Sequence, residues 1–229
     1  MKIAENYFRL GTENSFIILA KAKKLESEGK EIINLGIGQP DFLTPTHIVE
    51  AAKKALDEGH HGYTPANGTI ELRKGVSRHI KRMYGADIES ERVFIAPGGK
   101  PSIFFAIMMF GQPGVEILYP EPGFPVYESV INYSGATAVP MYLSEKKNYS
   151  FNADEVLNLI NEKTRLLIIN NPQNPTGGLI EKSEIDKLVK GLKKFPDVAV
   201  FSDEIYSRQI YDNKSMPSFF YYPELYDRL

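Results

Sequence analysis

Four loops in this sequence carry side chains that could contact a small ligand, and each follows an apolar stretch. The first, "PGGKPS", sets Gly98, Gly99 and Lys100 just before an apolar segment of helical character. Glycines let the backbone approach a ligand closely, and free N–H groups at a helix N-terminus favour a phosphate. A tight connection between two elements would also explain the glycine pair, because glycine is common in turns.

The second loop, "PEPGFPVYE", presents Phe124, whose flat ring could stack on a planar ligand or pack in the core. The third, "SDEIYSRQIY", places Asp203 directly after an apolar run. An aspartate there could hold magnesium in an ATPase, pair with a cationic ring nitrogen, or cap a helix. A P-loop would need its first glycine at Phe94 and its Ser or Thr at Pro101, which weakens the ATPase alternative.

The fourth loop lies in "LLIINNPQNPTGG", where four aliphatic residues run into two Asn-Pro steps and two glycines. The aliphatic run is typical of a buried strand, whereas no regular element tolerates so dense a group of prolines and glycines. The pattern therefore predicts a rigid turn that presents amide side chains at the end of a strand.

Composition narrows the classes of protein to consider. The chain has 229 residues, 42% hydrophobic and 24% charged, as expected for one sizeable domain or a large domain with a small appendage. Its net charge of -2 argues against nucleic acid, and without cysteine it has no disulfides or thiolate metal sites. The four histidines lack metal-ligand spacing, so we predict no metal. No apolar run reaches the about 20 residues of a membrane span, and the start does not resemble a signal peptide, which predicts a cytoplasmic protein.

The elements that must position these loops alternate along the chain. We expect helices over 15–30 and 69–85, a short strand over 32–38, and a helix with Thr44 as N-cap and Pro45 at its first position. Further strands are predicted over 92–96, 115–119, 136–143, 165–169 and 198–202, and helices over 102–110, 125–133, 153–161 and 182–194. This alternation predicts an α/β fold, a mostly parallel sheet with helices on both faces, whose ligands gather at the carboxyl ends of the strands.

Six motifs taken in order give a resemblance to a known family. "LGIGQPDF", "GYTPANGTIELR", "PGGKPSIFFA", "PEPGFPVYE", "NNPQNPTGG" and "SDEIYS" resemble the class I/II aminotransferases of pyridoxal-phosphate fold type I, near the aspartate and aromatic subgroup, from about residue 30 onward. The resemblance implies that residues 41–229 form a cofactor-binding large domain, incomplete at its C-terminus. Residues 1–40 would be an N-terminal segment that is part of the small domain.

The resemblance also implies roles for individual residues around pyridoxal 5′-phosphate. Backbone N–H groups of Gly98, Gly99 and Lys100 would bind its phosphate, Phe124 would stack on its ring, Asn174 and Tyr206 would contact its phenolic oxygen, and Asp203 would pair with its ring nitrogen. Gly38 would bind the substrate carboxylate, and Tyr63 would reach the phosphate of the other subunit, which implies a homodimer. The substrates would be an amino acid and a 2-oxo acid in biosynthetic amino acid metabolism, with aspartate, aromatic amino acids and alanine all open.

The family's Schiff-base lysine, which lies in a Ser-Lys motif on a later strand, has no counterpart here. Lys214 lacks the preceding Ser, and Lys100 lies at the phosphate end of the cofactor. We therefore assign no catalytic residue and expect a fragment that is inactive alone, with apolar sheet edges exposed where further strands would lie between 92–96 and 165–169. The alternative is a non-catalytic module that kept the cofactor pocket for binding or interaction.

Overall fold

The computed structural model describes residues 2–11, 14–36 and 38–229. The chain forms two compact units, of which the larger comprises Met1–Thr12 together with Ile70–Leu229 and the smaller Glu13–Thr69. The smaller unit contains two helices, α1 (Asn14–Ser27) and α2 (Thr46–Asp57). All the strands described belong to the larger unit, which therefore carries the sheet and its loops.

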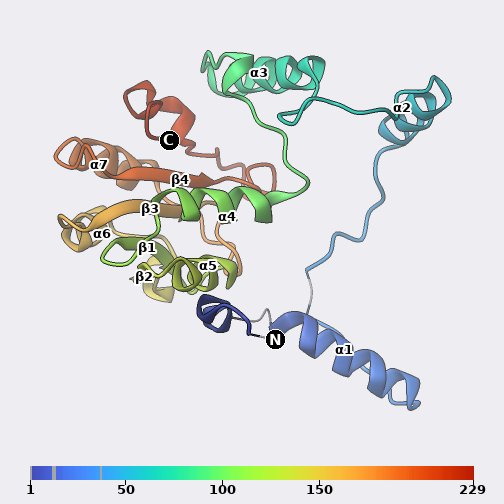
Figure 1. Ribbon diagram of the computed structural model, residues 1–229, viewed down its shortest axis with the longest axis horizontal. Coiled ribbons are helices and arrows are strands. Elements are labelled where there is room, and N and C mark those ends of the chain that lie inside the picture. The colour runs from blue at the N-terminus through green and yellow to red at the C-terminus, as the bar shows by residue number, and fades with distance from the viewer. Residues whose placement is uncertain (1, 12–13, 37) are drawn as a thin grey trace. The chain divides into compact units, whose positions relative to one another are not determined.

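A parallel four-stranded sheet forms the centre of the larger unit (Figure 1). Its order is β2-β1-β3-β4, with bounds β1 (Glu116–Glu121), β2 (Thr137–Tyr142), β3 (Thr164–Asn170) and β4 (Ala199–Asp203). Each neighbouring pair of strands is parallel. All four carboxyl ends consequently meet at one edge of the sheet, as the alternating pattern predicted.

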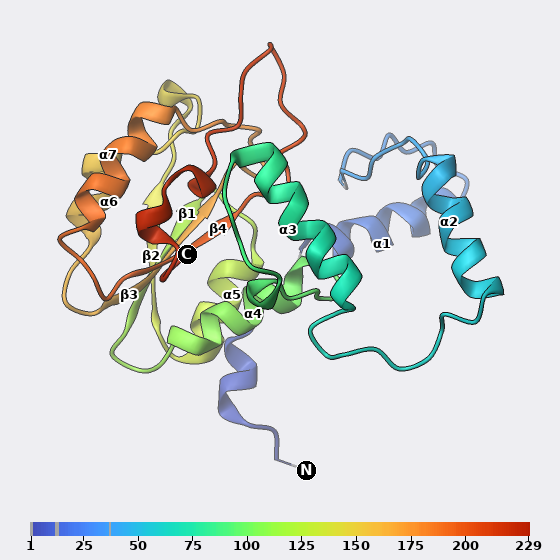
Figure 2. The same cartoon turned by 90° about the horizontal axis from the view of Figure 1, so that it is seen from above.

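Helices cover both faces of the sheet, which confirms the predicted fold class. One face packs against α4 (Gly99–Phe110) and α5 (Val126–Ser134), the other against α6 (Ala153–Leu159) and α7 (Lys182–Leu192), as Figure 2 shows. A further helix, α3 (Ile70–Tyr84), precedes these elements. Strand β3 supplies both cores, because Leu166 and Ile168 lie in the cluster under α4 and α5 while Leu167 and Ile169 lie in the other.

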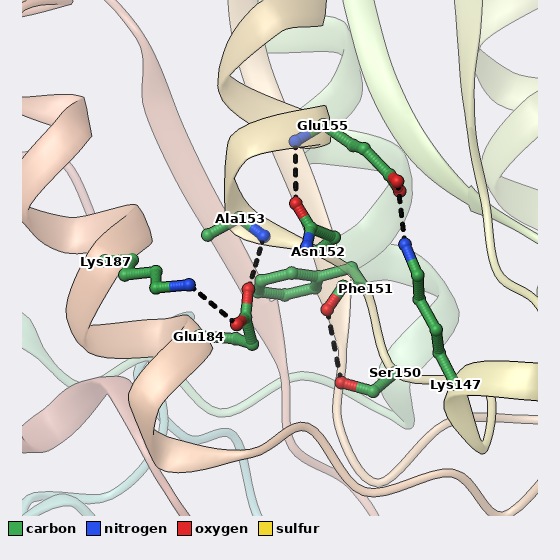
Figure 3. A network of polar contacts seen from close by, with 8 residues as sticks. All are labelled: Lys147, Ser150, Phe151, Asn152, Ala153, Glu155, Glu184 and Lys187. Atoms are coloured by element: carbon green, nitrogen blue, oxygen red, sulfur yellow. Dashed lines mark hydrogen bonds and ion pairs between the residues drawn. The ribbon is translucent and has the colours of Figure 1, made fainter.

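A network of polar contacts lies at the N-terminal ends of α6 and α7 (Figure 3). The Asn152 side chain caps α6 by accepting from the Glu155 N–H at 3.1 Å. Glu184 of α7 accepts from the Ala153 N–H at 2.7 Å and from Lys187 at 3.2 Å. The Ala153 N–H is the main reason that the pKa of the Glu184 carboxyl is lowered. The hydrogen bond between Ala153 and Glu184 joins the N-terminal ends of α6 and α7, which follow β2 and β3 along the chain.

Two predicted strands are wrong. Neither residues 32–36 nor residues 93–96 form a ladder with any described strand. A strand is stabilised by pairing with neighbouring strands, and an apolar run alone does not supply a neighbouring strand. The exposed apolar edge of the sheet was expected where further strands would lie between residues 92–96 and 165–169. Instead, β4 pairs directly with β3 and is itself an edge strand. An apolar hollow of about 440 Å³ lies there, between Phe94 and Phe201.

Two helix starts are also corrected. Helix α2 begins at Thr46, since the ψ angle of 137° at Pro45 is not helical, and neither Thr44 nor Pro45 provides a side-chain cap. Helix α4 begins at Gly99, three residues before the predicted start, because its first turn accommodates Pro101. The start of α4 at Gly99 brings the glycine pair to the helix N-terminus itself.

Candidate functional site

A cavity of about 510 Å³ lies at the carboxyl ends of β3 and β4, beside the N-terminus of α4. Six of the predicted site residues line it: Gly99, Lys100, Phe124, Asn174, Asp203 and Tyr206. Gly98 lies next to it as the residue before α4. Gly38 and Tyr63 belong to the smaller unit, and their predicted contacts, with the substrate carboxylate and with the phosphate of the other subunit, stay predictions.

The N-terminus of α4 forms one wall of the cavity. Gly98 has a φ of 88°, a left-handed conformation that glycine adopts without strain. Its N–H donates to the Ala96 carbonyl at 2.9 Å, so the turn itself uses that group. The N–H groups of a first helical turn lack partners within the helix, and Gly99, Lys100 and Ser102 all line the cavity. Ser102, which also lines this wall and carries a hydroxyl, was not singled out from the sequence.

Asp203 is held at the end of β4 by a residue that the sequence motifs did not single out. The Tyr127 hydroxyl donates to Asp203 Oδ2 at 2.6 Å, and the Ile205 N–H donates to Oδ1 at 3.3 Å. Tyr127 is fully buried, and burial, together with the Asp203 charge, raises the pKa of its hydroxyl far above the usual range. Tyr127 therefore stays protonated and acts as a permanent donor to the Asp203 carboxylate.

Asn174 and Tyr206 meet across the cavity. The Asn174 side-chain amide donates to the Tyr206 hydroxyl at 3.2 Å. The backbone of Asn174 is fixed by Asn170, whose Oδ1 accepts the Asn174 N–H at 2.7 Å and whose Nδ2 donates to the Asp203 carbonyl at 3.1 Å. Asn170, which is buried and was not singled out from the sequence, thus connects the loops that follow β3 and β4.

An aromatic wall closes the side of the cavity next to β1. The rings of Phe124 and Tyr127 are 5.9 Å apart in an edge-to-face arrangement. The Lys100 ammonium lies 5.9 Å from the centre of the Phe124 ring. A flat ligand beside Phe124 would therefore have the helix N-terminus at one end and the Asp203 carboxylate within the same cavity.

Glu204 adds a second acidic side chain to the lining of the cavity. Its carboxyl group accepts from the hydroxyls of Ser202 and Ser218 and from the Phe219 N–H. Burial raises the pKa of Glu204, and these hydrogen bonds partly offset the shift. Among the described residues, no group of three or more His, Cys, Asp or Glu side chains could hold a metal ion.

Comparison with known protein families shows to which family this chain belongs. A sequence profile described as "Aminotransferase class I and II" matches residues 30–225, which is most of the chain. The chain belongs to this family. The aspartate aminotransferase of Sulfurisphaera tokodaii is 39% identical over 207 residues, covering 88% of this chain and 51% of the relative. That of Bacillus subtilis is 31% identical over 229 residues, covering 100% of this chain and 57% of the relative.

Solved structures of aminotransferases share the fold. The aspartate aminotransferase from Rhizobium meliloti has a TM-score of 0.92 at 29% identity, covering 100% of this chain and 57% of that one. The alanine aminotransferase from Pyrococcus furiosus has a TM-score of 0.88 at 28% identity and covers 94% of this chain and 55% of that one. The chain spans about half the length of the curated relatives that it matches. These findings confirm the predicted fold type I architecture and remove the ATPase alternative.

In the part of the chain that the structure describes, none of the helices is long and apolar enough to cross a membrane.

Proposed function

We propose that this aminotransferase-family chain forms the pyridoxal-phosphate-binding part of an enzyme that transfers an amino group between an amino acid and a 2-oxo acid. The observation that carries the proposal is the convergence in one cavity of a helix N-terminus, an aromatic ring and an aspartate anchored by a buried tyrosine. The profile match over residues 30–225 supports it.

The side chains of the cavity fit the chemical groups of this cofactor. The first turn of α4 suits a phosphate, Phe124 suits a pyridine ring, and the Asp203 carboxylate suits a protonated ring nitrogen. The Asn174 Nδ2 atom and the Tyr206 hydroxyl oxygen are 3.2 Å apart, so one phenolic oxygen that faces both groups could be contacted by both. A volume of about 510 Å³ lies in the range of small-molecule sites.

Bound pyridoxal phosphate supplies an electron sink for charge that develops at the α-carbon of the substrate. Asp203 would keep the ring nitrogen protonated, which strengthens that sink. Tyr127 would hold the Asp203 carboxylate in one orientation through its 2.6 Å hydrogen bond. Asn174 and Tyr206 would direct their donors to the phenolic oxygen and favour its anionic form.

Further proposed roles lie at the phosphate end of the cavity and in the smaller unit. Gly99, Lys100 and Ser102 would bind the phosphate at the start of α4. Gly38 would bind the substrate carboxylate, and Tyr63 would reach the phosphate in a second copy, so we propose a homodimer. We also propose the large-domain boundary near residue 41, the cytoplasmic location and the biosynthetic role that the sequence predicted. The relatives are named for aspartate, alanine and aromatic amino acids, so the proposal includes no particular side chain of the substrate.

Cofactor binding can be tested on the 229-residue chain with pyridoxine 5′-phosphate. This compound keeps the ring, the phenol and the phosphate but lacks the aldehyde, so surface lysines cannot react with it. We expect binding in titration calorimetry, and a loss of at least about tenfold in affinity for Asp203→Asn, because a charge-assisted hydrogen bond contributes about 1.5–3 kcal/mol. Asp197→Asn, in the exposed turn before β4, should bind like the wild type.

The outcomes separate the proposal from its rivals. Binding that depends on Asp203 and not on Asp197 supports a cofactor site. Absence of binding by a chain with native circular dichroism would overturn the proposal. Binding that Asp203→Asn leaves unchanged would place the ligand somewhere other than this cavity and would equally contradict it.

A further inference from the structure

The loops that carry Phe124 and Asn174 follow strands that separate before they end. The pairing between β1 and β3 runs only to the partners Leu118 and Leu167. Beyond that point β1 pairs with β2 as far as Glu121, while β3 pairs with β4 as far as Asn170. No ladder of the described strands therefore fixes the distance between the two loops.

The side chain of Gln173 crosses this gap. Its Nε2 donates to the Pro122 carbonyl at 2.5 Å, in the loop that leads to Phe124, and to the Asn174 carbonyl at 2.8 Å. Its Oε1 accepts from the Thr176 N–H at 3.0 Å and from the Thr176 hydroxyl. Both amide protons and both acceptor positions are thus used, which fixes the orientation of the amide. Gln173 is 4% exposed, so water competes little for these bonds.

Backbone hydrogen bonds also close the turn around Gln173. The Gln173 N–H donates to the Gly178 carbonyl at 2.9 Å, and the Gly177 N–H donates to the Gln173 carbonyl at 2.8 Å. These two backbone bonds close the loop independently of the amide. The Gln173 side chain also does not line the cavity, in contrast to the neighbouring Asn174.

We propose that Gln173 is a positioning residue that sets the spacing between Phe124 and the Asn174 amide, and hence the width of the slot for a flat ring. The inference rests on the proposed function of the cavity. It differs from that function in that Gln173 touches neither the cofactor nor the reacting atoms. Its effect should fall on the ring of a ligand and spare the phosphate end, which α4 holds on another wall.

Gln173→Leu tests the proposal by removing all four hydrogen bonds with a side chain of similar size. We expect the affinity for pyridoxine 5′-phosphate to fall by about tenfold, the equivalent of one to two lost hydrogen bonds. Near-ultraviolet circular dichroism of the bound ring should weaken, because the ring is held less firmly. The affinity for inorganic phosphate, which lacks a ring, should stay unchanged.

Thr164→Val is the matched control. Thr164 is fully buried at the opposite end of β3, where its hydroxyl accepts from the Asn161 N–H at 3.1 Å. This variant should lower the melting temperature while leaving ring binding at the wild-type level. The comparison separates a positioning effect from a general loss of stability.

Gln173→Glu supplies a second, pH-dependent readout. A charged carboxylate would face the Pro122 and Asn174 carbonyls, whereas a neutral carboxyl group can donate to one of them. The affinity of this variant relative to the wild type, measured at the same pH, should recover as the pH is lowered. A role in stability alone would give such a recovery only together with refolding of the variant, which circular dichroism at each pH detects.

Each outcome decides a different question. If the wild type binds pyridoxine 5′-phosphate and Gln173→Leu binds it with the same affinity, only the positioning role is overturned. Variants that unfold at every pH assign Gln173 to stability and overturn it as well. If the wild-type chain itself fails to bind pyridoxine 5′-phosphate, the proposed function falls first and the positioning role falls with it.

Discussion

The pH dependence of stability should change when Glu204 becomes glutamine. The Glu204 carboxyl group lies at the end of β4 and accepts from Ser202, Ser218 and Phe219. Burial, which is the largest cause, raises its pKa above the usual 4.5, while the hydrogen bonds pull it down in part. The folded chain therefore binds the Glu204 proton more tightly than the unfolded chain does.

The sign of the effect comes from this difference in proton binding. The contribution of protonated Glu204 to stability is fully present below the unfolded pKa, and it is lost as the pH rises through the raised pKa of the folded state. For a single proton, the loss is at most about 1.4 kcal/mol for each pH unit crossed. Glutamine resembles the protonated acid and does not titrate, so Glu204→Gln removes this part of the slope.

Urea unfolding at pH values from 4.5 to 8 measures the effect. We expect the wild type and Glu204→Gln to be similar at the acidic end, and the wild type to lose stability relative to the variant as the pH rises. Glu89→Gln, at an exposed glutamate of the same unit, should follow the wild type at every pH. Glu204→Ala should be less stable by about 3 kcal/mol, because it leaves three donors without their acceptor at about 1 kcal/mol each.

Two results would refute this reasoning. A constant difference between the wild type and Glu204→Gln across the range would mean that the folded pKa of Glu204 is not raised. A wild type that gains stability over the variant with rising pH would mean that hydrogen bonds to the charged form outweigh its burial.

Two further predictions concern Tyr127, which lines the cavity, and Gly123, which directly precedes Phe124. Tyr127→Phe keeps the ring but removes the donor to Asp203, and it should weaken binding of pyridoxine 5′-phosphate by about five- to tenfold in calorimetry. The control is Tyr222→Phe, which should bind normally because the Tyr222 hydroxyl contacts α7 instead. Equal affinities for the two variants would contradict the anchoring role of Tyr127. Gly123→Ala would set a Cβ atom 2.1 Å from the Pro120 carbonyl oxygen. We expect the free energy of unfolding, measured in urea titrations, to fall by about 2 kcal/mol or more. An unchanged free energy of unfolding would show that this turn can open.

The local sequence pattern was sufficient to predict most helices and strands of the larger unit. The apolar runs at 115–119 and 165–169 and the charged amphipathic run at 69–85 each encode their element in neighbouring residues, and the structure has β1, β3 and α3 there. The runs at 32–38 and 92–96 are equally apolar, yet no described strand pairs with them. Their assignment failed because pairing is a property of two segments.

In the site as well, some features could be predicted from neighbouring residues, while others depend on segments that are distant in the sequence. Three of the four loops could be located from strand ends, and the parallel order then brought Phe124, Asn174 and Asp203 to one cavity. Their roles toward a cofactor stay predictions. Tyr127 could have been suspected from its place three residues after Phe124, but its partner Asp203 is 76 residues away. Gln173 looked like one more residue of a turn.

By itself, the sequence determined the class of fold, the family and the loops where ligands gather, because each of these depends on residue types at short spacing. Only the tertiary structure decided which side chains meet. Gln173 and Pro122 are 51 residues apart, and they come together because β1 and β3 are neighbours whose ends separate. A hydrogen bond across such a gap depends on the register and packing of the sheet, and no window of neighbouring residues contains that information.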